Sequence, residues 1–215
     1  MTGRIHGVAG GGLTDATWAA NAEVAKIGKA GEVKTAQMLN RFATHDSGVT
    51  VMHDLRIPIP GFTANVDHVV VSGEDIHIID AKVWKPARYW TFAGKTRRGW
   101  QRFEPAEKKT MAMAVDALGR FLDGRGIRAT IQVPTVVVWP SSTSRPLNVR
   151  WLRIPAARAM TGERFIRYAD KRFAPSGAFG IGGGDGKPAD PAVVAALAEL
   201  LVAPRREQRS TGTGW

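Results

Sequence analysis

The chain has 215 residues, of which 44 % are hydrophobic and 23 % charged, and this composition predicts a globular protein with one main domain and excludes global disorder. Thirty basic residues against 19 acidic ones give a formal charge of +11, which favours polyanionic partners such as nucleic acid. There are no cysteines, so a disulfide framework and thiolate-bound zinc or iron–sulfur sites are excluded.

The N-terminal part is predicted to be a flexible segment followed by a long helix. Residues 1–13 are rich in glycine and lack the long apolar stretch of a signal peptide. No later segment has the roughly 18 apolar residues that span a bilayer, so we expect a soluble, cytoplasmic protein without a membrane partner. From residue 15 to residue 42, apolar residues recur at three- and four-residue spacing, which predicts one face of a helix.

The middle of the chain is predicted to be mostly sheet. Apolar segments indicate a meander of three strands at 49–57, 64–71 and 76–83. The stretch from 89 to 103 carries aromatic and basic residues around two glycines and predicts a twisted hairpin. A second helix with a clear apolar stripe is expected from 106 to 123.

The last part of the chain is predicted to alternate between regular elements and loops. The expected elements are a buried strand at 130–140, a strand at 147–154, a helix at 162–172, a Gly/Pro-rich loop at 174–190, a helix at 191–203 and a basic tail at 204–215. Residues 14–173 would then form one α/β domain. Its mixed central sheet would carry helix 15–42 on one face and helix 106–123 on the same or the opposite face.

Three charged residues lie inside strands that otherwise look buried. Asp80 and Lys82 are two residues apart and therefore share one face of their strand. Asp67 stands beside Asp80 if the preceding strand pairs in register. Glu32 lies at the margin of the apolar stripe of the first helix, where it can lean over the sheet. Three carboxylates and an ammonium would thus converge.

Such a cluster needs a cation, because clustered carboxylates raise one another's pKa values and repel. Mg²⁺ or Mn²⁺ suits the cluster, since these ions prefer oxygen ligands and often take one or two carboxylates together with substrate phosphate oxygens. We expect Asp67 and Asp80 to bind the ion, and Glu32 to bind it directly or through water. Lys82 would position or deprotonate the attacking water and stabilise charge on phosphorus.

The pattern resembles the nuclease-related domain (NERD) family, a branch of the PD-(D/E)xK nuclease-like superfamily. The similarity lies in the ordered series Gly31-Glu32, Val66-Asp67-His68 and Ile79-Asp80-Ala81-Lys82, with Trp84 two residues on and "HDLRIPIPG" at 53–61. It covers about residues 26–122. The resemblance implies a restriction-endonuclease-like fold, metal or catalytic roles for Glu32, Asp67 and Asp80, and a catalytic role for Lys82.

One position departs from the family pattern. Family members often carry glutamine early in the helix after the hairpin, in a context like Asn-Pro-x-x-Gln. Here the corresponding stretch, residues 104–108, ends in Lys108. The substitution puts the rate or specificity implied by the resemblance in doubt.

Substrate contacts are predicted from the segment that follows the Asp80 strand. Between Lys85 and Lys109 there are eight basic and two acidic residues. Interleaved Tyr89, Trp90, Phe92, Trp100 and Phe103 can stack on bases while the basic side chains meet phosphates. The nucleic-acid-binding candidates are Lys85, Arg88, Lys95, Arg97, Arg98, Trp100, Arg102 and Lys108.

These observations favour a metal-dependent nuclease acting on DNA, or on RNA. The alternative is a catalytically weak or inactive adaptor module of the same fold that binds nucleic acid, and a third possibility is a plain interaction domain. Each feature taken singly also has a simpler interpretation: Glu32 as a solvated helix residue, Asp67 as a turn or cap residue, and the basic segment as a solvated face.

His68 is expected to donate to a neighbouring backbone group or carboxylate, and Trp139 and Trp151 to serve as anchors. Endo or exo cleavage and the oligomeric state, including a dimer, stay open.

Overall fold

A computed structural model describes residues 4–11, 22–44, 48–175 and 184–202 of the chain. The predicted basic tail at 204–215, residues 176–183 of the predicted Gly/Pro-rich loop and the first turns of the predicted N-terminal helix lie outside these residues. No helix among the described residues is long and apolar enough to cross a membrane.

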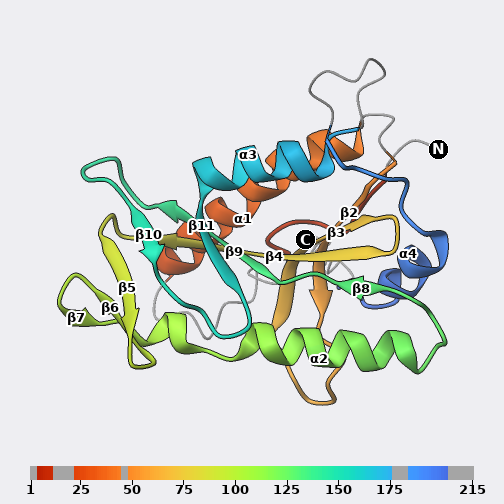
Figure 1. The fold of residues 1–215 in the computed structure, drawn as a ribbon, viewed down its shortest axis with the longest axis horizontal. Coiled ribbons are helices and arrows are strands. Elements are labelled where there is room, and N and C mark those ends of the chain that lie inside the picture. The colour runs from red at the N-terminus through yellow and green to blue at the C-terminus, as the bar shows by residue number, and fades with distance from the viewer. Residues whose placement is uncertain (1–3, 12–21, 45–47, 176–183, 203–215) are drawn as a thin grey trace, which may run out of the picture.

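In the described part of the chain, seven strands form the central sheet (Figure 1). Six of them follow the order β1-β2-β3-β4-β9-β11, and β8 also pairs with β4. The β2–β3–β4 meander is antiparallel, whereas β9 and β8 run parallel to β4, β11 runs parallel to β9, and β1 runs parallel to β2. The bounds are β1 Ile5–His6, β2 Thr50–Arg56, β3 Asn65–Ser72, β4 Asp75–Trp84, β8 Thr130–Ile131, β9 Thr135–Pro140 and β11 Arg158–Thr161.

Helices cover both faces of this sheet (Figure 1). Helices α1 (Ala22–Ala43) and α3 (Gly162–Phe173) lie side by side on one face, where Leu39 and Phe165 are fully buried in one core cluster with Ile79. Helices α2 (Thr110–Asp123) and α4 (Pro191–Ala198) contribute Leu118 and Leu197 to the core on the other face. The predicted α/β class with a mixed, helix-flanked sheet is confirmed, and the second predicted helix lies on the face opposite the first.

A four-stranded sheet stands beside the main one and contains the predicted hairpin. Its order is β10-β5-β6-β7, with bounds β5 Arg88–Phe92, β6 Lys95–Arg98, β7 Gln101–Arg102 and β10 Asn148–Trp151. Trp84 at the end of β4 packs against Tyr89 and Phe103, with ring centroids 5.0 and 4.9 Å away. This aromatic contact fastens the inner face of the small sheet to the main one.

Several predicted boundaries differ from the structure for local reasons. The N-terminal segment predicted as flexible contains β1, because its Ile5–His6 backbone pairs with β2. A 3₁₀ turn (η2, Glu104–Glu107) precedes α2, and the extended backbone of Lys108 separates the two. The strand predicted at 130–140 is two strands, β8 and β9. Helix α4 starts where Asp190 caps the N–H groups of Ala192 and Val193, and its residues belong to the main core.

Two contacts fix α1 over the sheet. Gly31 has no side chain, and a Cβ there would overlap a methyl group of Val83 on β4. One turn later the buried Thr35 hydroxyl accepts a hydrogen bond of 2.8 Å from the indole of Trp139 on β9 and donates one of 2.9 Å to the Gly31 carbonyl. The middle of α1 is therefore held directly against β4 and β9.

The close approach at Gly31 predicts a specific cost for adding a side chain. Gly31→Val is expected to lower the free energy of unfolding by roughly 1–3 kcal/mol more than Gly119→Val, because overpacking a fixed contact forces the helix to move. Gly119 is the matched control, since it also lies within a helix but a Cβ there meets nothing within 4 Å. Urea unfolding of both variants measures the difference, and equal losses would contradict the proposed contact.

Candidate functional site

The strand pair that carries Asp67 and Asp80 stops pairing at the point where these residues stand. The last paired residues of the β3–β4 ladder are His68 and Ile79, and by the same register Asp67 lies opposite Asp80. The backbone N–H of Ala81 donates instead to Oδ2 of Asp67, at 2.7 Å. The predicted in-register placement of the two aspartates is confirmed.

A third aspartate joins them from the neighbouring strand. Asp54 on β2 lies between the pairs His53–His68 and Leu55–Val66, so the register puts it opposite Asp67. Its φ of +57° is unusual for a residue other than glycine, and its carboxylate accepts a hydrogen bond of 2.8 Å from the Asn65 amide. Asp54 is a residue for which no role was predicted. The available signal was an acid within a strand of otherwise buried residues.

Lys82 is the cation of the cluster. Its Nζ lies 2.8 Å from Asp80 and 3.8 Å from Asp67. The Lys82 side chain is 44 % exposed, whereas those of Asp67 and Asp80 are 14 % and 9 % exposed. Burial lowers the pKa of Lys82, but the carboxylates of Asp80 and Asp67 outweigh this effect and hold the pKa above its ordinary value. The amine is therefore protonated at neutral pH.

Helix α1 brings Glu32 to the same place. Glu32, Asp54, Asp67, Asp80 and Lys82 line a pocket of about 400 Å³, here called the acidic pocket. Burial, followed by the charge of Asp67, raises the pKa of Glu32 to about 8. Burial likewise raises the pKa of Asp67 to about 7, with Asp80 adding to the rise and Lys82 opposing it.

The donor set suits a hard cation but is not preassembled around one. Four carboxylates and two lysines, Lys82 and Lys108, line the pocket, and the raised pKa values of Glu32 and Asp67 mean that the pocket retains protons near neutral pH. A divalent ion would replace those protons, because metal binding requires deprotonated ligands. Across the described residues, no group of three or more histidine or acidic side chains is arranged so that it could hold a metal ion. The metal therefore stays a prediction that rests on ligand chemistry.

The predicted nucleic-acid-binding residues fall into separate places. Lys108 lines the acidic pocket. Arg88 and Trp100 line a second pocket on the small sheet. Lys85 and Lys95 are exposed, whereas Arg102 pairs with Glu107 at 2.7 Å. Arg98 bonds to Gln101, and Arg97 to the carbonyl of Trp100.

The predicted stacking residues divide in the same way. Tyr89 is fully buried, so the expectation that its ring stacks on bases is wrong. Phe103 is partly buried and packs against Tyr89 and Trp84. Trp90, Phe92 and Trp100 line the second pocket, together with Trp151. Trp139 is a core anchor as expected, whereas Trp151 is half exposed.

The histidines near the site are structural. His68 is fully buried, and its Nδ1 lies 2.9 Å from Nδ1 of His53, whose other ring nitrogen lies 2.8 Å from the Asn40 side-chain oxygen. Its side-chain partner is thus another histidine and not the carboxylate or backbone group expected. Burial lowers the pKa of both rings, to about 4 for His53, so they are neutral at pH 7.

The raised carboxylate pKa values predict how stability depends on pH without metal. The pKa of Glu32 rises from 4.5 to about 8 on folding, so between these values the folded state holds a proton that the unfolded chain releases. Stability in EDTA should therefore fall as the pH rises from 5 to 8. Glu32→Gln should reduce this fall by about 1.4 kcal/mol or more, the free energy of one pKa unit.

Urea unfolding at several pH values between 5 and 8 measures this slope. The exposed Glu74 in the β3–β4 turn supplies the control, and Glu74→Gln should keep the wild-type slope. An unchanged slope in Glu32→Gln would mean that Glu32 ionises normally in the folded protein.

Comparison with known proteins agrees with the geometry. A family model described as a nuclease-related domain matches residues 27–140, which is more than half of the chain. No curated protein and no solved structure gives a match. The matched range runs from α1 to the end of β9 and contains Glu32, Asp67, Asp80 and Lys82. The chain belongs to the nuclease-related domain (NERD) family.

Proposed function

We propose that this protein is a metal-dependent nuclease that hydrolyses phosphodiester bonds in DNA, with Glu32, Asp67, Asp80 and Lys82 as its catalytic residues. The observation that carries the proposal is the convergence of these four side chains in one pocket, from helix α1 and the adjacent strands β3 and β4. Family membership supports the nuclease class. The excess of carboxylates over amines supports a requirement for a cation.

Asp67 and Asp80 would hold Mg²⁺ or Mn²⁺, and Glu32 would bind it directly or through water. The ion, when bound, supplies a Lewis acid for the phosphate and lowers the pKa of a bound water. Asp67 is prepared for this role because the Ala81 N–H fixes one of its oxygens. Asp54 adds negative charge beside Asp67 and strengthens the attraction for a cation.

Lys82 acts as a charged hydrogen-bond donor in this proposal. Because neighbouring carboxylates hold its pKa above the ordinary value, it favours positioning the attacking water over deprotonating it. Its amine would also stabilise the negative charge that develops on the phosphate oxygens. Without the metal the pKa of Glu32 is raised to about 8, so Glu32 would release a proton when it binds the ion.

Lys108 supplies positive charge on the side of the acidic pocket formed by the segment after the hairpin, where it lies with Trp84 and Pro105. An ammonium at this position attracts the substrate phosphate as a point charge, whereas the glutamine common in the family offers only a neutral amide. We therefore assign Lys108 to substrate binding. The exposed Lys85 and Lys95 extend the positive surface along the small sheet.

The nuclease activity is tested with labelled single-stranded and double-stranded DNA in Mg²⁺ and in EDTA. Wild-type protein should cleave only with the metal, and Asp80→Asn and Lys82→Ala should each lower the cleavage rate at least about 100-fold. Asp116→Asn, an exposed aspartate on α2, should cleave like wild type. Cooperative thermal unfolding would show that the variants are folded.

Salt-dependent DNA binding without cleavage would instead select the adaptor alternative. Absence of both binding and cleavage would leave a plain interaction domain. RNA substrates in the same assay separate a deoxyribonuclease from a ribonuclease.

The role of Lys108 predicts an effect on binding more than on turnover. Lys108→Ala should raise KM several-fold and leave kcat within about threefold. It should also reduce, by about one, the slope of the logarithm of the DNA-binding constant against the logarithm of the salt concentration. Lys109→Ala is the matched control, because Lys109 is exposed and is not among the residues lining the acidic pocket. Steady-state kinetics across a salt series measures both quantities. A loss confined to kcat would assign Lys108 to the chemical step instead.

A further inference from the structure

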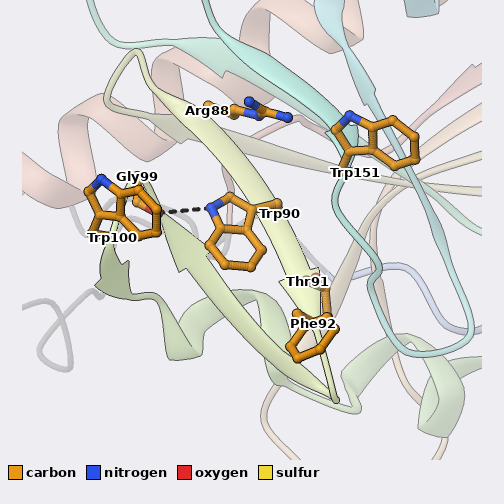
Figure 2. A pocket seen from close by; sticks show the side chains of 7 residues that line it. All are labelled: Arg88, Trp90, Thr91, Phe92, Gly99, Trp100 and Trp151. Atoms are coloured by element: carbon orange, nitrogen blue, oxygen red, sulfur yellow. Dashed lines mark hydrogen bonds between the residues drawn. The ribbon is translucent and has the colours of Figure 1, made fainter.

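The outer face of the small sheet carries a second pocket, here called the aromatic pocket. It has a volume of about 550 Å³, and Trp90, Phe92, Trp100 and Trp151 contribute rings to it beside Arg88 (Figure 2). The volume lies within the roughly 300–1,000 Å³ typical of small-molecule sites. Trp100 is 86 % exposed, Phe92 74 % and Trp151 51 %. Aromatic rings gathered at a surface in this way mark a binding site.

The pairing of the strands fixes the positions of these rings in the unbound protein. Alternation along β5 turns Tyr89 toward the core and Trp90 outward. The parallel pairing of β10 with β5 puts Trp151 beside Trp90. Trp100, in the turn between β6 and β7, meets Trp90 edge to face, with ring centroids 6.4 Å apart.

A hydrogen bond of 2.8 Å from the indole of Trp90 to the Gly99 carbonyl, drawn in Figure 2, holds that turn. The polar group of Trp90 is therefore satisfied within the protein. What the pocket offers to a ligand is mainly ring faces and edges.

The charge around the pocket identifies the class of ligand. The two stretches that form the small sheet, 88–102 and 148–151, contain six basic and no acidic residues. The guanidinium of Arg97 lies 5.8 Å from the ring centroid of Trp90, and that of Arg150 lies 5.3 Å from that of Trp151. A ligand complementary to this surface carries flat apolar groups, which stack on the rings, and several negative charges, which meet the basic side chains. Nucleic acid with accessible bases has both features.

We infer that the aromatic pocket binds unpaired nucleotides of a single-stranded DNA segment, whose bases stack on Trp100 and Trp151 and whose phosphates meet Arg88 and its basic neighbours. Bases within a duplex cover one another's faces, so only an unpaired strand can use these rings. The inference rests on the proposed function in one respect, since it takes the bound strand to be part of the substrate of the acidic pocket.

The position of the aromatic pocket links it to the acidic pocket. Trp84 lines the acidic pocket and packs on the inner face of the small sheet, whose outer face carries the aromatic pocket. Pro105 and Lys108, which follow β7 directly, also line the acidic pocket. A DNA strand bound in the aromatic pocket is thus attached to the sheet that borders the proposed catalytic residues. The preferred substrates would be single-stranded DNA, or duplexes with a gap or an unpaired end.

Binding measured in EDTA tests this inference without depending on cleavage. The probes are fluorescently labelled oligo(dT), an abasic oligomer with the same number of phosphates, a blunt duplex and oligo(rU). The variants are Trp100→Ala with Trp151→Ala, and Trp100→Phe with Trp151→Phe as the conservative pair. Met113→Ala, on the exposed side of α2, controls for the loss of exposed apolar surface.

The alanine pair is expected to weaken oligo(dT) binding roughly 5- to 100-fold, and to change binding of the abasic oligomer and of the duplex less than twofold. The phenylalanine pair should recover most of the affinity, and Met113→Ala should bind like wild type. Quenching of tryptophan fluorescence by oligo(dT), but not by the abasic oligomer, should accompany binding. Equal losses for all probes, or no loss for oligo(dT), would overturn the inference. Tighter binding of oligo(rU) than of oligo(dT) would overturn the assignment to DNA.

The failure of the two proposals is distinguishable. Base-dependent binding through Trp100 and Trp151 without any metal-dependent cleavage would keep the inference and remove the proposed catalysis. Cleavage of single-stranded DNA by the alanine pair at the wild-type KM would keep the nuclease and remove the aromatic pocket from substrate binding.

Discussion

The repulsion among four carboxylates that share a pocket with two lysines is the constraint around which this structure is arranged. Asp54, Asp67 and Asp80 follow one another across three adjacent strands, and Glu32 adds a fourth acid from α1. Stability alone does not favour such an arrangement, because burial and mutual repulsion raise the pKa values of Glu32 and Asp67. The rest of the fold compensates for this unfavourable charge cluster. The β3–β4 ladder is fully paired from His68–Ile79 to Ser72–Asp75, and an apolar core covers each face of the sheet. An unfavourable charge cluster held by a favourable scaffold is typical of a functional site.

Packing and chemistry are coupled through α1. The helix must lie close to β4 for Glu32 to reach the aspartates, and the absence of a side chain at Gly31 permits that approach. The hydrogen bond between Thr35 and Trp139 fixes the helix along its axis, and Leu39 and Phe42 bury its next turns. Gly31, which has no side chain of its own, thus controls the position of the Glu32 carboxylate.

The small sheet gives the family domain a second surface. The inner face of the small sheet packs against the end of β4 through aromatic rings, and its outer face carries the aromatic pocket. Most of this sheet comes from residues inside the matched range, 27–140, but β10 comes from beyond it and contributes Trp151. The residues that follow extend the main sheet with β11 and cover it with α3. Residues 148–173 therefore complete both sheets.

The sequence determined the features that depend on local periodicity and on ordered motifs. The main helices, the β2–β3–β4 meander, the hairpin and the convergence of Glu32, Asp67, Asp80 and Lys82 were all predictable, because alternation and helical spacing fix which side chains share a face. Only the tertiary structure decided features that depend on which elements meet. Asp54 joins the acidic pocket because the β2–β3 register puts it opposite Asp67, and His68 meets His53 across the same two strands. Tyr89 became a core residue because the small sheet packs on Trp84, and Trp151 became a pocket residue because β10 pairs with β5. Pairing between strands that are distant in sequence has no local signature. The sequence therefore predicted the catalytic candidates and named Arg88 and Trp100 as binding residues, but it did not place Trp151 beside them.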